Sequence, residues 1–306
     1  MTGFLAVTNA AAGQGSGTGL DDALAVLREA GDLQVCATDS AAETADALSR
    51  RGDRRVVVCG GDGSLHTVVA ALRRHGALHE AGPIGVIPLG TGNDLARSAD
   101  IPLDPVAAAR VAVDGTARPR ELLIDDEGGI VVNAVHVGIG AQAGRAAHKW
   151  KPRIGMAAYP VGSVIAGARS PGWRLRIEVD QQLVSDVDSP ILMVGLALGT
   201  SIGGGAQLAP DAEPDDGLVD VVISYAVGPV ARLGYALHLR RGDHVQRDDV
   251  HATLAHTVTI SGQPFPWNAD GELGAPIRRR TWVVQRRAWN LLVPNSAQDE
   301  SRSTSA

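Results

Sequence analysis

The sequence predicts an α/β fold in which a doubly wound parallel sheet is followed by a mainly antiparallel second part. Up to about residue 116, short apolar runs alternate with amphipathic, helix-like segments. Strands that helices cover on both faces have this continuous apolar character. After residue 116, strand-like segments follow one another with few helical interruptions, which favours antiparallel sheets.

The first part contains four strand-like and three helix-like segments in alternation. The strands are expected at residues 4–8, 33–38, 55–59 and 84–87, and the helices at 20–30, 41–51 and 64–75. Ligands of a doubly wound sheet bind beyond the carboxyl ends of its strands. The glycine-rich turns of this sequence lie at those ends.

The second part is expected to contain seven strands and two helices. The strands are predicted at residues 121–124, 130–137, 175–179, 191–198, 218–224, 258–260 and 281–285, and the helices at 157–168 and 230–240. The boundary falls near residues 116–119, which gives domains at 1–118 and 119–295. Residues 296–306 are polar and rich in serine, and are predicted to form a disordered tail.

Length and charge limit the class of protein. A chain of 306 residues exceeds the usual size of one domain. The formal net charge of −6 argues against extensive binding to nucleic acid. We see neither a signal peptide nor an apolar stretch long enough to span a membrane. We therefore expect a cytoplasmic protein, which could still associate peripherally with the inner face of the membrane.

The first motif is GGDGS at residues 60–64, between an apolar run and a helix-like segment. Its glycines allow backbone N–H groups to approach an anion, and the following helix start adds a positive dipole end. Asp62 could hold a magnesium ion that bridges phosphate oxygens. The alternative is a tight turn with an aspartate near a helix start.

A second turn, PLGTGNDLAR at residues 88–97, follows the next strand-like run. Gly90 and Gly92 free the backbone, and Thr91, Asn93 and Asp94 supply polar groups. Taken alone, the turn also fits a helix capped by Asn93 or Asp94. Two such turns on consecutive strands indicate a nucleotide site.

A third segment follows the first strand, where a phosphate loop often lies in this architecture. It matches neither the GxGxxG nor the Walker pattern. Its residues are Asn9, Ala10, Ala11, Ala12 and Gly13.

These motifs together resemble the diacylglycerol kinase catalytic-domain family, which includes bacterial lipid kinases and the sphingosine and ceramide kinases. The resemblance covers most of the chain. Residues 9–13 are similar to the family's opening element, 133–141 to its central glycine segment, and 203–220 to its GGG…DG-L-D element. Residues 270–272 resemble the DGE signature. GGDG alone is shared with NAD kinases and phosphofructokinases.

The resemblance implies an ATP site between a Rossmann-like, NAD kinase-like domain and a β-sandwich, with Asp62 organising the phosphates and Mg²⁺. Asp270 and Glu272 would act near the acceptor hydroxyl, with Glu272 the favoured base. Without the resemblance, residues 270–272 would be interpreted as a hairpin with exposed acids. The candidate nucleotide-binding set is Asn9, Ala10, Ala11, Ala12, Gly13, Thr38, Gly60, Gly61, Asp62, Gly63, Ser64, Leu65, His66, Thr67, Gly90, Thr91, Gly92, Asn93 and Asp94.

The resemblance also implies a structural Mg²⁺ in the acidic loop at residues 211–218, held by Asp216 and the carbonyls of Glu213 and Leu218. A solvated acidic loop is the alternative. The sequence departs from the family at several positions: Ala10 replaces proline, and Ser64 replaces the commoner threonine. His66 and Thr67 stand where Asn-Glu is usual, which removes an acid near the phosphates.

The expected function is ATP-dependent transfer of the γ-phosphate to a lipid hydroxyl, such as that of diacylglycerol, at a membrane surface. One alternative is an NAD kinase-like enzyme that acts on a small molecule. Another is a nucleotide-binding regulatory protein without catalysis. The sequence leaves a homodimer open. The basic run of His148, Lys149, Lys151 and Arg153 is a candidate for contact with lipid headgroups or a solvated loop.

Overall fold

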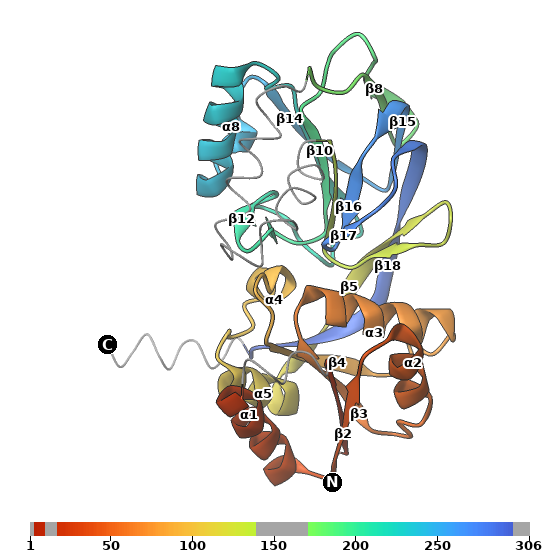
Figure 1. The fold of residues 1–306 in the computed structure, drawn as a ribbon, viewed down its shortest axis with the longest axis vertical. Helices are drawn as coiled ribbons and strands as arrows, with labels where there is room; N and C mark the ends of the chain where they lie inside the picture. The colour runs from red at the N-terminus through yellow and green to blue at the C-terminus, as the bar shows by residue number, and fades with distance from the viewer. Residues whose placement is uncertain (1–2, 10–16, 139–170, 296–306) are drawn as a thin grey trace. The chain divides into compact units, whose positions relative to one another are not determined.

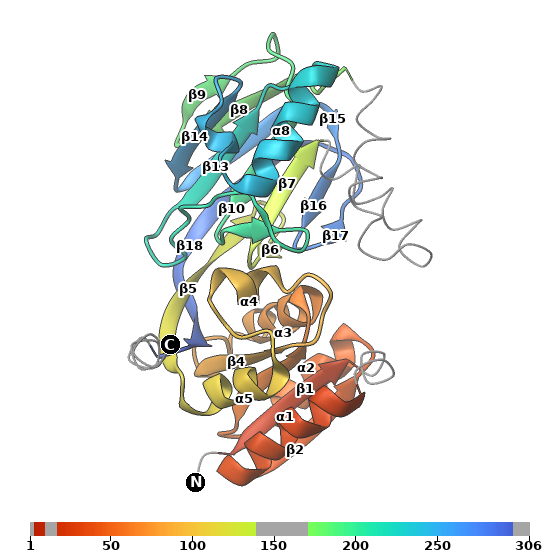
Figure 2. The ribbon, with the colours of Figure 1, turned by 90° about the vertical axis from the view of Figure 1, so that its left-hand side faces the viewer.

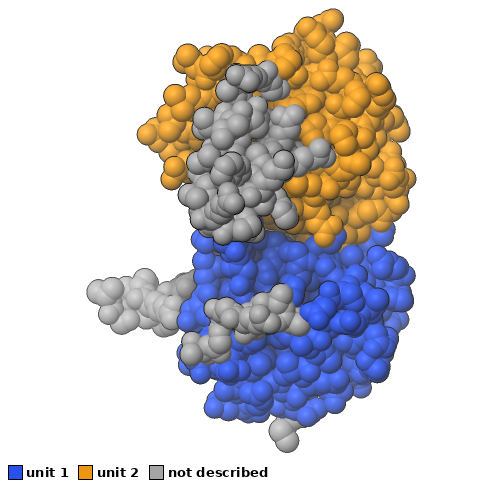
Figure 3. Space-filling model, in the orientation of Figure 1, with its two compact units in different colours: residues 1–120, 287–306 blue, residues 121–286 orange. Residues whose placement is uncertain are grey.

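The computed structural model describes residues 3–9, 17–138 and 171–295 (Figure 1). Its contacts divide the chain into two units, residues 1–120 with 287–306 and residues 121–286 (Figure 3). The boundary between residues 120 and 121 lies close to the predicted boundary at residue 118. The boundary between residues 286 and 287 has no counterpart in the prediction, which places residues 287–295 in the second domain. The helix expected at 157–168 and the basic run at 148–153 lie outside the described residues.

The first unit contains the predicted parallel sheet, with strand order β2-β1-β3-β4. Helices α1 and α5 lie on one face of this sheet, and α2 and α3 on the other (Figure 1). The elements are β1 (Phe4–Asn9), α1 (Gly17–Ala30), β2 (Leu33–Thr38), α2 (Ala41–Ser49), β3 (Arg55–Gly60), α3 (Asp62–Arg74), β4 (Pro83–Pro88), α4 (Asp94–Ser98) and α5 (Pro105–Asp114).

Local signals explain the helix starts of this unit. Ser40 caps α2 by accepting a hydrogen bond from the backbone N–H of Glu43. Asp104 caps α5 in the same way, and Pro105 occupies the first helical position. Helix α5 packs closely on the sheet, since a Cβ on Gly85 would lie 2.7 Å from the Cβ of Ala112. Helix α5 lies outside the segments that the sequence pattern predicts as helical.

The second unit contains two mainly antiparallel sheets packed as a sandwich. One has the order β14-β13-β10-β7-β16-β17, and the other includes β18, β15, β8 and β9 with β5 and β6 beside them. The strands are β5 (Thr116–Asp125), β6 (Ile130–Val131), β7 (Ala134–Gly138), β8 (Leu175–Val179), β9 (Gln182–Ser185), β10 (Met193–Ala197), β13 (Val219–Ser224), β14 (Val250–Ala255), β15 (Thr257–Phe265), β16 (Trp267–Ala269), β17 (Glu272–Leu273) and β18 (Ile277–Val293). The short pair β11 (Ser201–Ile202) and β12 (Ala206–Gln207) forms a ribbon of its own.

Strand β10 shows how the core of this unit is layered. Val194 and Leu196 lie in the large cluster shared by the two sheets, together with Trp282. Met193 and Ala197, on the opposite face, join a second cluster with Tyr235 of α8 (Pro229–Arg241). Side chains alternate across a strand, so both faces of β10 are buried. Helix α8 therefore covers the outer face of the six-stranded sheet (Figure 2).

Strand β18 belongs to both units, since its residues from 287 onward are grouped with the first. Its earlier part pairs antiparallel with β15, and its end pairs parallel with β4 through Asn290 and Leu291. The first unit therefore borrows a sheet strand from the carboxyl end of the chain. Within the described residues, no helix is long and apolar enough to cross a bilayer.

Leu291→Ala tests the importance of this borrowed strand. Leu291 is fully buried, so its truncation is expected to lower the free energy of unfolding by about 2–5 kcal/mol. The control is Val283→Ala in the same strand, where the side chain is 44% exposed. Denaturant titrations of both variants measure the difference. Equal stabilities would contradict a structural role for the end of β18.

Candidate functional site

The carboxyl ends of four parallel strands bring the predicted site residues of the first unit together. Asn9 pairs in register with Thr38, and Gly60 with Pro88. The Thr38 side chain is buried, and its hydroxyl lies 3.0 Å from that of Thr44 and 3.4 Å from the carbonyl oxygen of Thr8. Its role in the structure is thus to join β2 to its neighbours. Ala10, Ala11, Ala12 and Gly13 lie outside the described residues.

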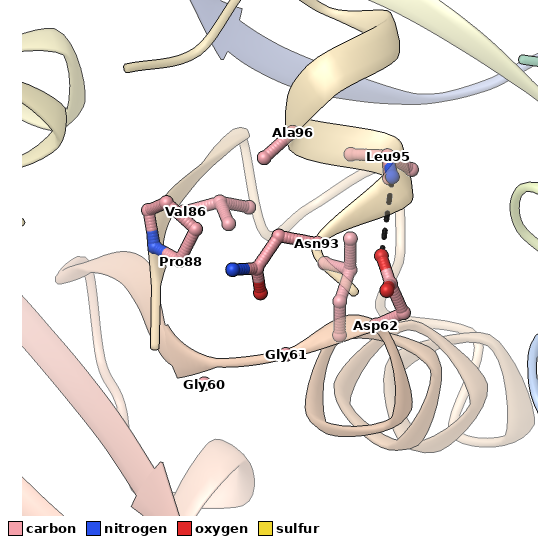
Figure 4. Close-up of a pocket in the computed structure, with 9 residues that line it drawn as sticks. Gly60, Gly61, Asp62, Val86, Pro88, Asn93, Leu95 and Ala96 are labelled. Carbon is pink, nitrogen blue, oxygen red and sulfur yellow. Dashed lines mark hydrogen bonds between the residues drawn. The ribbon is translucent and has the colours of Figure 1, made fainter. Parts of the chain in front are cut away.

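The two glycine-rich turns pack directly against each other (Figure 4). A Cβ on Gly90 would lie 2.5 Å from the Cα of Gly61, and one on Gly61 would lie 2.9 Å from the Cα of Gly90. Neither position accepts a side chain without movement of the backbone. These two glycines are therefore required by the protein's own packing, in addition to any approach of a phosphate.

Asp62 links the turns by capping the helix that begins in the other turn. Its carboxylate accepts hydrogen bonds from the backbone N–H groups of Asp94 and Leu95, both at 3.1 Å. Asn93 occupies the N-cap position of α4, with φ of 53°, but its side chain makes no cap bond. Instead its amide closes the turn, accepting from the N–H of Gly90 at 3.0 Å and donating to its carbonyl at 2.8 Å. The cap of α4 thus comes from Asp62 and not from Asn93 or Asp94.

The pocket between the turns is small. It has a volume of about 10 Å³, room for about one water molecule. A nucleotide would therefore lie over the turns and not between them. Gly63, Gly90 and Thr91 are exposed there, beside the start of α3 with its positive dipole end. The pocket is lined by Gly60, Gly61, Asp62, Leu65, Val86, Pro88, Asn93, Leu95 and Ala96.

The other predicted residues of α3 have different environments. The Leu65 side chain is buried, so only its backbone could reach a ligand. Ser64 lies against Gly60, since a Cβ on that glycine would be 2.4 Å from the serine hydroxyl. Thr67, which stands where the family has glutamate, donates its hydroxyl hydrogen to the carbonyl of Gly63 at 2.9 Å. His66 is half-buried.

In the second unit, Asp270 and Glu272 lie on a two-residue hairpin between β16 and β17. Asp270 and Gly271 have φ of 49° and 91°, both in the left-handed region that such turns require. The Asp270 carboxylate accepts three backbone hydrogen bonds, from Val132, Asn133 and Ala134, at 2.7–3.1 Å. Glu272 is exposed. The two acids therefore have different surroundings, one built into the fold and one facing solvent.

The acidic loop of the second unit lies beside two carboxyl groups with raised pKa values. Burial, together with the negative charges of Asp216 and Asp215, raises the pKa of Glu121 to about 7. A hydrogen bond from the backbone of Gly217 lowers this pKa but does not outweigh the burial. Burial and the charge of Asp216 also raise the pKa of Asp220 to about 6. Glu121 was predicted only as a strand residue. The signal in the sequence is an acid directly before the apolar run Leu122–Leu123–Ile124.

The predicted Mg²⁺ ligands of this loop provide oxygen donors, which suit a hard cation. Asp216 accepts from the N–H of Leu218 at 2.8 Å, which holds its carboxylate beside that backbone. A cation here would relieve the negative charge that raises the pKa of Asp220. Among the described residues, no group of three or more His, Cys, Asp or Glu side chains is arranged to hold a metal. The predicted site relies instead on one carboxylate and two backbone carbonyls.

Comparison with known proteins gives matches along most of the chain. Residues 3–123 match the model described as diacylglycerol kinase catalytic domain. Residues 133–292 match the model described as YegS C-terminal NAD kinase beta sandwich-like domain. Among curated proteins, the chain is 34% identical over 269 residues to "Probable lipid kinase YegS-like" of Xanthomonas oryzae pv. oryzae, covering 83% of this chain and 84% of that protein.

Two further similarities agree with these matches. A "Diacylglycerol kinase" of Staphylococcus carnosus is 30% identical over 224 residues, which cover 72% of this chain and 71% of that protein. A solved structure of a diacylglycerol kinase from Bacillus anthracis superposes with a TM-score of 0.76 at 20% identity, over 97% of this chain and 98% of that one. This likeness confirms the predicted two-part fold.

Gly90→Ala tests the contact between the turns. The added methyl would overlap the backbone of Gly61, so the free energy of unfolding is expected to fall by about 1–3 kcal/mol. Gly63→Ala is the matched control, because a Cβ there meets nothing within 4 Å and alanine favours a helix by up to about 1 kcal/mol. Thermal melts compare the two. A Gly90→Ala protein as stable as Gly63→Ala would contradict the close contact.

Glu121→Gln tests the raised pKa of the buried acid. The folded state holds this proton more tightly than the unfolded chain, so Glu121 stabilises most below about pH 4.5, its ordinary pKa. That contribution is lost as the pH rises through about 7. The variant should therefore gain stability relative to wild type between pH 5 and 8 in EDTA. Glu29→Gln, at an exposed position, is the control and should show no such trend.

Proposed function

Because the chain belongs to the family of lipid kinases with a diacylglycerol kinase catalytic domain, we propose that it transfers the γ-phosphate of ATP to a lipid hydroxyl, with diacylglycerol as the acceptor class and a phosphatidic acid as product. The observation that carries the proposal is the paired glycine turns at the ends of β3 and β4, held together through Gly61, Gly90 and Asp62. Such a rigid, exposed backbone surface at a helix start suits the phosphates of a nucleotide.

Phosphoryl transfer needs positioned phosphates, neutralised charge and an oriented acceptor hydroxyl. In the proposal, the turns and the start of α3 bind the phosphates. Magnesium bound with ATP would neutralise phosphate charge. Asp62 fits as a ligand, because its carboxylate supplies the hard oxygen donors that Mg²⁺ prefers and lies where the two turns meet.

Glu272 is the proposed general base. It is exposed, whereas the carboxylate of Asp270 is engaged with three backbone N–H groups. Glu272 would accept the proton of the lipid hydroxyl as that oxygen attacks the γ-phosphorus and the bond to the β-phosphate oxygen breaks. Asp270 would hold the hairpin from which Glu272 projects and would act as a positioning residue.

Glu272→Gln is expected to lower phosphate transfer about 10²–10⁴-fold, because the amide cannot accept the proton. ATP affinity and melting temperature should stay unchanged, since the side chain is exposed. The measurement is transfer of labelled γ-phosphate from ATP to a total lipid extract, with chromatography of the labelled lipid. The control Glu80→Gln changes an exposed glutamate in the first unit and should retain activity.

The same assay discriminates the alternatives. A wild-type protein that phosphorylates NAD and no lipid would indicate an NAD kinase-like enzyme. Tight ATP binding without transfer to any acceptor would indicate a regulatory protein. Full activity of Glu272→Gln would assign the base to another group.

Gly63→Ala should weaken ATP binding although it leaves the fold intact. A Cβ at Gly63 meets no atom of the protein within 4 Å, so only an external ligand would collide with it. We expect ATP affinity to fall about tenfold or more, the cost of displacing a phosphate from backbone N–H contacts. Calorimetric titration measures it, with Gly228→Ala in the second unit as the control, because an added Cβ there also meets nothing within 4 Å. Unchanged affinity would mean that the phosphates do not lie over α3.

A further inference from the structure

Helix α8 has two apolar faces. One of them is buried and the other is exposed. On the inner face, Tyr235 is buried in the cluster against the six-stranded sheet, where Ala231 and Leu239 are partly buried. The spacing of these residues, i, i+4 and i+8, is that of one helix face. This face anchors α8 to the sheet (Figure 2).

The opposite face forms a stripe of three exposed aliphatic residues, Val230, Leu233 and Leu237, which we name the outer stripe. Their side chains are 85%, 62% and 50% exposed, and their spacing of i, i+3 and i+7 aligns them along the helix. Among the described residues, the other large exposed hydrophobic side chains lie outside α8, on five different strands or loops or next to them, at Val35, Leu103, Leu183, Val187, Leu254 and Val283. A single exposed aliphatic residue is ordinary, but an aligned stripe indicates a contact surface.

Helix α8 itself carries positive charge beside the outer stripe. Helix α8 contains no acidic residue, and Arg240 and Arg241 are exposed in its last turn. The acid that follows, Asp243, lies 2.7 Å from the ring of His238. The chain as a whole carries a net charge of −6, so this helix differs in sign from the average surface. An anionic surface complements it.

We propose that α8 docks the protein on a bilayer that contains anionic lipids, with the outer stripe inserted at the headgroup boundary and Arg240 and Arg241 on lipid phosphates. Aliphatic side chains gain free energy by leaving water at that depth, and guanidinium groups bind phosphates in a bidentate manner. This proposal rests on the proposed function in one respect, because a lipid kinase takes its acceptor from such a surface. Docking itself involves no phosphate transfer.

Vesicle co-sedimentation of the full chain tests this docking. The probes are vesicles of phosphatidylcholine with and without phosphatidylglycerol. Wild type should bind the anionic vesicles more tightly, with the preference decreasing as salt is added. Leu233→Gln with Leu237→Gln should weaken binding at least about tenfold on anionic vesicles. Arg240→Gln with Arg241→Gln should remove the preference for anionic lipid, about tenfold or more.

Matched controls separate docking from general effects. Leu183→Gln with Leu254→Gln changes two leucines that are each 48% exposed elsewhere in the second unit. Arg28→Gln with Arg110→Gln removes two exposed arginines of the first unit. Both control pairs should bind like wild type. All variants should keep the wild-type melting temperature, because none removes a buried side chain.

The outcomes are distinct from those of the kinase assay. Equal binding of wild type and the α8 variants, or no preference for anionic vesicles, would overturn the proposal. If the leucine pair changed the oligomeric state measured by light scattering but not vesicle binding, a second copy would cover the stripe and the proposal would be wrong. Stripe-dependent binding by a protein that transfers no phosphate would support docking and contradict the proposed function.

Discussion

The contact between Gly61 and Gly90 is the constraint on which the arrangement of the first unit's site depends. Two neighbouring parallel strands end there, and their turns can touch only because neither carries a side chain at that point. Asp62 then fixes the start of α4 relative to the start of α3 through two backbone bonds. The site surface is therefore made of backbone whose position is set by packing. Changes in neighbouring side chains, such as Ser64 and Thr67, leave that surface in place.

In the hairpin of the second unit, backbone contacts also fix the position of functional groups, in this case a pair of acids. A left-handed turn brings Asp270 back over the start of β7, where three N–H groups hold its carboxylate. This fixes the backbone from which Glu272 extends. Asp270 and Glu272 are similar acids in the sequence, but they differ in the structure. Among the described residues, the surrounding backbone N–H groups reach only the first of them.

The sequence alone predicted the alternation of β1 to β4 with their helices, because buried parallel strands are continuous apolar runs. It did not predict α5, whose alanine- and valine-rich sequence has only Arg110 before the final Asp114 to mark a polar face. It also predicted only residues 281–285 of β18, since arginines interrupt the apolar pattern of a strand that spans residues 277–293. The capping of α4 by Asp62 depends on a contact 32 residues along the chain, which no local pattern encodes. The raised pKa of Glu121 depends on burial, which one acid in an apolar run only suggests.

The shared strand β18 also governs the order in which the protein can be completed during synthesis. The edge of β4 gains its partner only when residues after 286 leave the ribosome, after the whole of residues 121–286. At ordinary translation rates these 166 residues (286 − 121 + 1) take roughly 10–30 s. For that time the edge of β4 at Pro83 and Ile84 is unpaired, and an open strand edge is a template for aggregation. The first unit, although made first, is thus the part whose sheet is closed last.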